Sequence, residues 1–327
     1  MTSIAILTAG ATQVNDSREP SMRKIARCPG YAGALVLAGA AVFAAPAAAQ
    51  ASAALPGPSV VPCSSSALVT AINKANSAGS AILQLAQGCN YVLTSAATGN
   101  DGLPPVTGKI VIIGGHGTQI SRTPSANPFR ILDVAAGGVL TLGNVTVANG
   151  VLTNSGERAG GIRDAGTLVL QHVRLTGNNS VGFGGGLSVE NGAQATVSGS
   201  ELDGNVTDGV GGAIFNDGHL LIDRSTLTGN EAPFGSGGAL YTNTGSATWI
   251  SGTVVTRNSA KLHGGGIFNT AAIMLSGDRV TFNQASQGGG GGISNASSGT
   301  VSLLFTVVAS NSPDNCSPQG TIRGCQS

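Results

Sequence analysis

From about residue 60 onward, apolar and polar positions repeat with a period of about 26 residues. In one column, an apolar residue follows a Gly pair or triplet, at steps of 25, 27, 26, 27 and 26: Ile162, Leu187, Ile214, Leu240, Ile267 and Ile293. In a second column, Leu or Val stands three residues before Asn178, Asn205, Asn230, Asn258, Asn283 and Asn311. Two columns that hold phase over six repeats indicate a repeat architecture.

The segments between the columns alternate in polarity, as in Thr167–Leu170 and Leu220–Asp223. Alternation with β-branched residues predicts strands, and the Gly- and Asn-rich breaks predict turns. No helical periodicity is evident within 160–311. We therefore expect three short strands per repeat and an all-β chain, a single-stranded right-handed parallel β-helix. Counting Ile82–Leu85 and Lys109–Ile113 as early coils gives about nine coils.

Stacked coils explain both columns. Asn side chains at equivalent turns can form a ladder of amide hydrogen bonds, and Gly at equivalent turns allows close backbone approach. We interpret both columns as structural. The Gly-rich runs 184–186 and 288–292 are not phosphate loops, because they lack a following Lys and helix.

The two ends of the solenoid are expected to be covered. Ser64–Ser77 fits an N-terminal capping helix, with Ser66 as N-cap and Leu68, Ala71, Ile72 and Ala75 on one face. We divide the chain into a signal segment (1–51), a cap helix with the first coil (60–95), the parallel β-helix (96–311) and a C-terminal cap (312–327).

The cysteines support the same organisation. An even number in an exported chain favours disulfides, and sequence proximity favours Cys63–Cys89 and Cys316–Cys325. The alternative that these cysteines are free thiols or are paired differently stays open at this point. No Cys-x-x-Cys spacing indicates zinc.

The N-terminus has the features of a targeting segment. Basic residues in 22–27 precede an apolar stretch over 32–45 and small residues at 47–51, which is typical of a cleaved signal peptide. Met22 is a possible true start. We expect a secreted or cell-surface protein, with the periplasm as an alternative, no integral membrane segment after cleavage, and a monomer.

Composition agrees with a low-charge solenoid. Gly accounts for 51 of 327 residues and charged residues for 9%, while the hydrophobic fraction of 41% is enough for a core. The formal net charge of +1 and the absence of a basic stripe argue against a nucleic-acid partner.

The Gly-Gly-Ala-Ile (211–214) and Gly-Gly-Ala-Leu (237–240) motifs, with the apolar-x-x-Asn elements, resemble the repeats of the chlamydial-type polymorphic outer-membrane protein family over roughly 145–311. The resemblance implies a pectin-lyase-like fold and a surface role such as adhesion. Leu or Val replaces the Phe of that family's Phe-x-x-Asn motif. The mature chain also resembles secreted bacterial β-helix repeat proteins with a Cys-containing cap.

Enzymes of the pectin-lyase-like fold act on acidic polysaccharides, but their motifs are scarce here. Gly115-His116-Gly117 matches one short polygalacturonase-like element, whereas Asp-Asp, Asn-Thr-Asp and Arg-Ile-Lys are missing from the sequence. We interpret His116 as a turn residue. The sequence thus predicts no catalytic residue, no metal site and no cofactor.

Two groups of residues interrupt the repeat and are the candidate sites. Charged residues gather in the turns between Asn and the next Gly-Gly: Glu157, Arg158, Asp208, Glu231, Lys261 and His263. We favour a solvated mixed-charge edge over a binding cluster. Three aromatics, Phe215, Tyr241 and Phe268, occupy equivalent positions in successive coils. They form either an exposed stripe for a glycan or partner, or an internal stack, which the scarcity of aromatics slightly favours.

The leading hypothesis is an exported, non-catalytic β-helix protein that binds a cell-surface component or an extracellular polysaccharide. The alternative is a polysaccharide lyase or glycoside hydrolase acting on an acidic polysaccharide through the charged turns. A third hypothesis, an architectural or ice- or mineral-binding rod, is disfavoured by irregular spacings.

Overall fold

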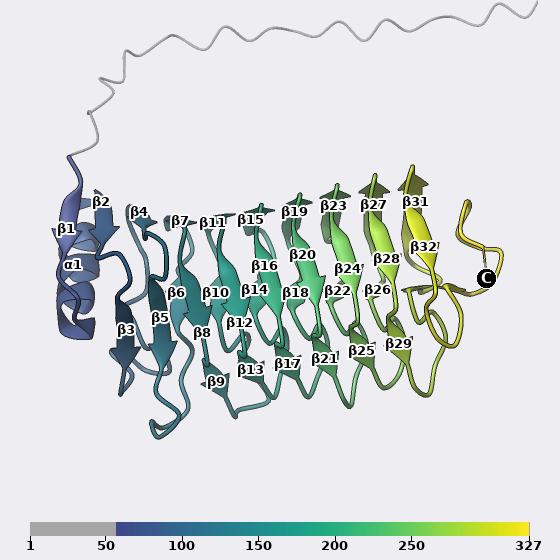
Figure 1. The fold of residues 1–327 in the computed structure, drawn as a ribbon, viewed down its shortest axis with the longest axis horizontal. Helices are drawn as coiled ribbons and strands as arrows, with labels where there is room; N and C mark the ends of the chain where they lie inside the picture. The colour runs from purple at the N-terminus through teal and green to yellow at the C-terminus, as the bar shows by residue number, and fades with distance from the viewer. Residues whose placement is uncertain (1–56, 327) are drawn as a thin grey trace, which may run out of the picture. The chain divides into compact units, whose positions relative to one another are not determined.

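The computed structural model describes residues 57–326, which form a parallel β-solenoid of about ten turns (Figure 1). The predicted all-β parallel solenoid is confirmed. The predicted signal segment lies outside the described residues. Sequence counting found nine of the ten turns and missed β1 (Ser59–Val61), which precedes the first helix and pairs with β2 (Ser80–Leu85).

Strands at equivalent positions pair in parallel into four sheets that run along the solenoid. Besides β1 and β2, the ten-stranded sheet contains β4 (Lys109–Ile113), β7 (Val139–Gly143), β11 (Thr167–Gln171), β15 (Gln194–Ser198), β19 (His219–Asp223), β23 (Ala247–Ser251), β27 (Ala272–Ser276) and β31 (Thr300–Leu304). The nine-stranded sheet contains β3 (Asn90–Leu93), β5 (Gln119–Arg122), β8 (Thr146–Ala148), β12 (Arg174–Thr176), β16 (Glu201–Asp203), β20 (Thr226–Thr228), β24 (Val254–Thr256), β28 (Arg279–Thr281) and β32 (Val307–Ala309).

The other two sheets flank the Gly-rich turns. The six-stranded sheet contains β9 (Val151–Leu152), β13 (Asn179–Ser180), β17 (Val206–Thr207), β21 (Glu231–Ala232), β25 (Ser259–Ala260) and β29 (Gln284–Ala285). The eight-stranded sheet contains β6 (Leu132–Val134), β10 (Ile162–Asp164), β14 (Leu187–Val189), β18 (Ile214–Asn216), β22 (Leu240–Thr242), β26 (Ile267–Asn269), β30 (Ile293–Asn295) and β33 (Cys316–Ser317). A regular coil therefore has four strands rather than the predicted three, because a two-residue strand follows each ladder Asn.

The Asn column forms the predicted ladder. The Nδ2 of Asn205 donates to Oδ1 of Asn230 at 3.0 Å, and the Nδ2 of Asn230 donates to Oδ1 of Asn258 at 2.9 Å. Each Nδ2 also donates to a backbone carbonyl of the preceding coil, Leu202 in the case of Asn230. These amides are fully buried, so the ladder satisfies groups that would otherwise be costly to bury.

A Gly is required where successive turns touch. A Cβ on Gly209 would collide with the backbone carbonyl of Gly182 in the preceding coil. The side chain of any other residue would therefore force the turns apart.

Helix α1 (Ser65–Ala78) lies at the N-terminal end of the solenoid (Figure 1). It buries Leu68, Ile72 and Ala75 and contacts β2, β3 and β4. The N-cap of the helix is Ser64, two positions before the expected Ser66.

Both expected disulfides are present. Cys63 is bonded to Cys89 beside α1, and Cys316 is bonded to Cys325 at the other end of the solenoid, where Ile322 is buried. The pairing predicted from sequence proximity is therefore confirmed.

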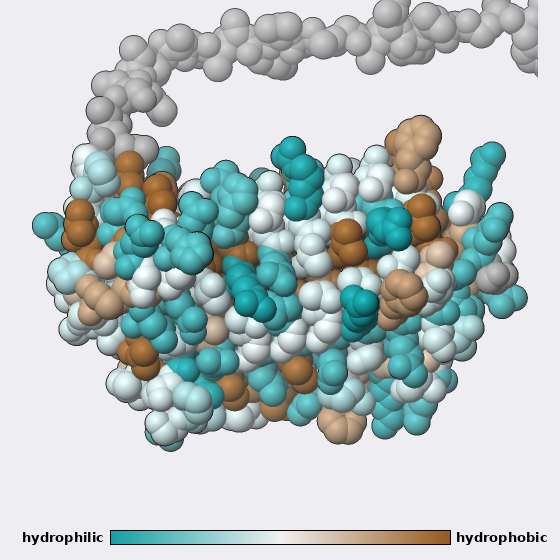
Figure 2. All heavy atoms as spheres, viewed as in Figure 1, coloured by the Kyte–Doolittle hydropathy of each residue, from teal (hydrophilic) through white to brown (hydrophobic). Residues whose placement is uncertain are grey.

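The face shown in Figure 2 is mainly hydrophilic or neutral, and its apolar side chains are scattered. On the outer face of the ten-stranded sheet, Leu221, Trp249 and Met274 are each 40–47% exposed. Within residues 57–326, no helix has the length and apolar character needed to cross a membrane.

Candidate functional site

The middle residue of each three-residue strand in the eight-stranded sheet points away from the core, because its neighbours in the strand face inward. Ile214, Leu240 and Ile267, for example, are fully buried in the hydrophobic core. Strand register aligns the outward residues in one line, which we call the outer column: Asp133, Arg163, Ser188, Phe215, Tyr241, Phe268 and Ser294.

The aromatic residues of the outer column form a continuous stack. The ring centroids of Phe215 and Tyr241 are 5.7 Å apart, and those of Tyr241 and Phe268 are 5.2 Å apart, with interplanar angles of 17° and 27°. Phe183, from the turn before β14, adds a tilted ring 5.0 Å from Phe215. The interpretation as an internal stack is therefore wrong: the core is filled by the Ile/Leu column, and the rings lie on its outer side.

The rings differ in exposure. Phe215 is only 3% exposed, whereas Tyr241 and Phe268 are half-buried. Burial raises the pKa of the Tyr241 phenol, so this group stays a neutral hydroxyl donor at physiological pH.

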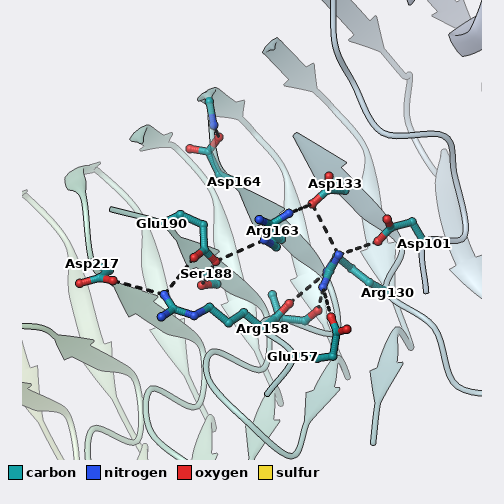
Figure 3. Close-up of polar contacts among 12 residues, drawn as sticks. Asp101, Arg130, Asp133, Glu157, Arg158, Arg163, Asp164, Ser188, Glu190 and Asp217 are labelled. Carbon is teal, nitrogen blue, oxygen red and sulfur yellow. Dashed lines mark hydrogen bonds and ion pairs between the residues drawn. The ribbon is translucent and has the colours of Figure 1, made fainter. Parts of the chain in front are cut away.

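Arg158 covers the buried end of the stack. Its guanidinium carbon lies 4.9 Å from the ring centroid of Phe215 and 5.3 Å from that of Phe183. Its Nη1 is 3.0 Å from Oε2 of Glu190 and 3.4 Å from Oδ2 of Asp217 (Figure 3). Arg158 thus extends from the turn before β10 across the ring of Phe215 to residues that follow β14 and β18.

Arg130 organises the neighbouring charges. Its side chain is 4% exposed and contacts Asp101 at 2.6 Å and Glu157 at 3.0 Å, with Asp133 at 3.5 Å. Its Nε donates to the backbone carbonyl of Arg158 at 3.0 Å. Arg130 therefore fixes the turn from which the Arg158 side chain extends.

Arg163 joins the two halves of this arrangement. It lies 2.7 Å from Asp133 and 3.5 Å from Glu190. We use the term ionic network for Asp101, Arg130, Asp133, Glu157, Arg158, Arg163, Glu190 and Asp217 (Figure 3). Five carboxylates thus face three guanidiniums, and each guanidinium contacts at least two carboxylates.

The ionic network lines a solvent-accessible cavity of about 380 Å³, bordered by Arg130, Gly156, Glu157, Arg158, Arg163 and Glu190. Beside this cavity, the pKa of Asp101 is raised to about 6, because burial outweighs the opposing effect of Arg130. Behind Arg163, burial raises the pKa of Asp164 to about 7. Its Oδ1 accepts a hydrogen bond from the Gly166 backbone N–H, and its Oδ2 has no hydrogen-bond partner among residues 57–326.

Polar residues flank the aromatic stack. Asp217, Asn243 and Thr270 each stand two positions after an outer-column ring, on the same outer side of the sheet. Nδ2 of Asn243 donates to Oδ1 of Asp217 at 2.7 Å. Half-buried rings beside fixed hydrogen-bonding groups form an amphipathic strip. Arg158 covers one end of this strip and also lines the cavity of the ionic network, so the two adjoin, and we call the strip and the cavity together the groove.

The six residues of the predicted charged-turn cluster do not come together. Glu157 and Arg158 belong to the ionic network, whereas Asp208 and Glu231 are exposed. Lys261 lies 5.5 Å from the ring of Phe234, and His263 lies 6.0 Å from that of Phe268. Among the described residues, no ion pair joins any two of the six. The physical reason is the different position of each residue in its coil. Arg158 lies in the column that continues through Phe183 to Val210, whereas Glu231 pairs with Val206 and Ser259 in a strand.

Sequence reasoning missed most of the ionic network. Asp133, Arg163 and Ser188 share the phase of Phe215, so extending the aromatic column backward by whole coils would have found them. Asp101 and Arg130 lie in the irregular early coils, where the repeat gives no phase. Two conspicuous sequence features also stay outside: His116 lies in a separate depression with His172 and Arg174, and the Asn ladder is internal.

Over residues 57–326, no group of three or more His, Cys, Asp or Glu side chains is arranged to hold a metal ion. No protein-family model matches the sequence, and no curated protein or solved structure is significantly similar to it. The fold and the groove define the chain as a parallel β-solenoid with an outer amphipathic groove.

Proposed function

We propose that this protein is an exported, non-catalytic solenoid that binds a glycan in the groove along the eight-stranded sheet, in the manner of an adhesin. The observation that carries the proposal is the run of stacked rings from Phe215 to Phe268 beside Asp217 and Asn243. Aromatic rings pack against the apolar faces of sugars, and fixed carboxylate and amide groups bond their hydroxyls. Solenoids commonly use such extended surfaces for binding.

We include in the same proposal the fold details and the location that the resemblance to polymorphic outer-membrane protein repeats implies. A pectin-lyase-like, right-handed coil with an N-terminal capping helix and a cell-surface or secreted location would place the groove where extracellular polysaccharides are accessible. The two disulfides are compatible with export, since such bonds persist in oxidising compartments.

Calorimetric titration of the purified protein against a panel of polysaccharides tests the binding function. Tyr241→Ala and Phe268→Ala should each weaken glycan binding about fivefold or more, because loss of a packed aromatic contact costs about 1 kcal/mol or more. Trp249→Ala removes a half-exposed ring from a different sheet and is the matched control. If no glycan binds, or if both groove variants bind as tightly as the parent, the proposal is wrong.

A second candidate function is hydrolysis or lysis of a polysaccharide by the ionic network. The specific observation in its favour is that two carboxylates, Glu157 and Glu190, share one cavity with three arginines, and that Asp101, bound to Arg130 beside this cavity, has a pKa of about 6. A carboxyl that titrates near neutral pH can act as a general acid. Against this role, the side chain of Asp101 is held 2.6 Å from Arg130 and is 14% exposed.

The two functions differ in turnover. Prolonged incubation with the same panel, followed by assays for new reducing ends and unsaturated products, should give no products if the protein only binds. Product formation that Asp101→Asn abolishes would establish catalysis and overturn the non-catalytic proposal.

A further inference from the structure

The charges of the groove determine which class of glycan it can accept. Arg158 contacts Glu190 and Asp217, and Arg163 contacts Asp133 and Glu190. Arg130 is almost fully buried among three carboxylates. Every guanidinium of the ionic network is thus already neutralised, and none is left to pair with an anionic ligand.

The balance of charge is negative. With all groups ionised, three positive and five negative charges give the network a formal charge of −2. Most of these groups are largely shielded from solvent, so salt screens their field less than at an open surface. A uronic-acid chain would bring further carboxylates into this field without gaining a cation.

The same groups favour hydroxyl donors. An ionised carboxylate only accepts hydrogen bonds and offers about four lone-pair sites. Asp217 has two partners, Arg158 and Asn243. Glu190 has three, Arg158, Arg163 and Ser188, so each carboxylate keeps at least one free site. The free sites on Glu190 and Asp217 lie next to the aromatic stack, since Arg158 reaches both across the ring of Phe215. A sugar hydroxyl donating to such a carboxylate makes a charge-assisted bond.

We infer that the groove selects an uncharged glycan and rejects polyuronates. The inference rests on the proposed glycan binding and adds the ligand class. It also separates this protein from the acidic-polysaccharide substrates that the alternative enzymatic hypothesis requires.

Hexasaccharides that differ only in charge provide the test. Fully methyl-esterified hexagalacturonate and its de-esterified acid share sugars and linkage, and neutral hexasaccharides of glucose, mannose, xylose and galactose complete the panel. At least one uncharged hexasaccharide should bind at least about tenfold more tightly than the de-esterified hexagalacturonate. Its affinity should change less than about twofold between about 20 mM and about 300 mM NaCl, because no net charge is brought to the groove.

A double variant reverses the preference. Glu190→Gln with Asp217→Asn removes both carboxylates that hold Arg158, and the acid hexamer should then bind about tenfold more tightly than it does to the parent. Glu201→Gln with Asp203→Asn makes the same charge change around Arg174 on another sheet and is the matched control. Thermal melts confirm that each variant is folded.

The outcomes separate the two proposals. Tighter binding of the acid hexamer than of any uncharged glycan to the parent would overturn the charge selectivity alone. The same holds if the groove variant gains no affinity for the acid, or if the control variant gains as much. Failure of every glycan, charged or uncharged, to bind would overturn both the proposed function and this inference.

Discussion

Arg158 and Phe215 form a stacked pair on the outside of the solenoid, with the guanidinium carbon 4.9 Å from the ring centroid. The pair explains how a large aromatic ring on an outer column is only 3% exposed. It also joins the charged and aromatic parts of the groove, because the same guanidinium contacts Glu190 and Asp217.

Arg158→Ala should lower the free energy of unfolding by about 1–3 kcal/mol, through loss of the cation–π contacts and of partly buried ion pairs. Urea denaturation measures the effect. Arg224→Ala is the control, since the Arg224 side chain is 77% exposed and its ion pair within the described part of the chain is with its neighbour Asp223; it should cost less than about 0.5 kcal/mol. Equal losses in both variants would show that the stacking of Arg158 contributes nothing.

Asn230→Ala should be among the most destabilising single changes in the ladder. It removes the acceptor for the backbone N–H and Nδ2 of Asn205 and the donor to the Leu202 carbonyl. Buried groups left without partners cost about 1–3 kcal/mol each, so we expect a loss of about 3–5 kcal/mol in urea denaturation. Asn311→Ala, at the half-buried end of the ladder, should cost clearly less. A larger loss at Asn311 would contradict the ladder's role.

Asp164 should make stability depend on pH. The folded-state pKa is raised from 3.8 to about 7 by burial, so the folded protein holds this proton more tightly than the unfolded chain. The contribution of Asp164 to the free energy of unfolding therefore falls as the pH rises from about 4 to about 7 and stays low above pH 7. One pKa unit corresponds to about 1.4 kcal/mol, and the full effect is about 4 kcal/mol.

Asp164→Asn should remove that slope and stabilise the protein at pH 8. Asn216 and Asn269 already occupy the same position in later coils, where their Oδ1 atoms accept from backbone N–H groups two residues on, as Oδ1 of Asp164 does. Urea denaturation from pH 4 to pH 8 measures the difference. Asp208→Asn, at an exposed turn, controls for the loss of one carboxylate. A variant whose stability keeps the parent's pH profile would refute the assignment.

Removing each disulfide should have unequal effects. Cys63–Cys89 spans 26 residues and Cys316–Cys325 spans 9. Loop-closure entropy gives losses of about 3.5 and about 2.6 kcal/mol respectively. Paired Cys→Ser variants in urea measure both values, and a larger loss at the C-terminal bond would contradict the entropic explanation.

The repeat made much of the fold predictable. Coil spacing, the Asn ladder and both disulfides follow from local patterns, because every regular coil solves the same packing problem with the same residue types. The side of the sheet on which Phe215, Tyr241 and Phe268 lie could not be predicted from these local patterns. Their scarcity suggested burial in the core, whereas Phe215 is buried outside the core, under an arginine 57 positions earlier in the chain.

The ionic network was harder to predict for a different reason. Glu157 and Arg158 stood out as charges in a turn, but their partners lie in other coils, and the coils differ in length. Glu157 pairs with Arg130 in the preceding coil, and Arg158 pairs with Glu190 and Asp217 further along the chain. The Asp101–Arg130 contact joins a loop to the segment just before β6. A parallel β-bridge pairs the two residues, but the Gly-Gly and Asn columns that mark the phase in the sequence do not extend to these coils. Ion pairs of this kind depend on long side chains reaching between coils, which sequence spacing does not encode.

The outer column contributes one side chain per coil, and neighbouring coils of a parallel sheet are about 4.8 Å apart. The groove therefore presents one side chain of the outer column about every 4.8 Å, and these side chains change from charged to hydroxyl-bearing to aromatic along its length. Duplication or loss of a whole coil would lengthen or shorten the groove by one outer-column side chain and leave the contacts within the other coils unchanged. Evolution could in this way match the protein to longer or shorter polymers while every coil keeps its own contacts.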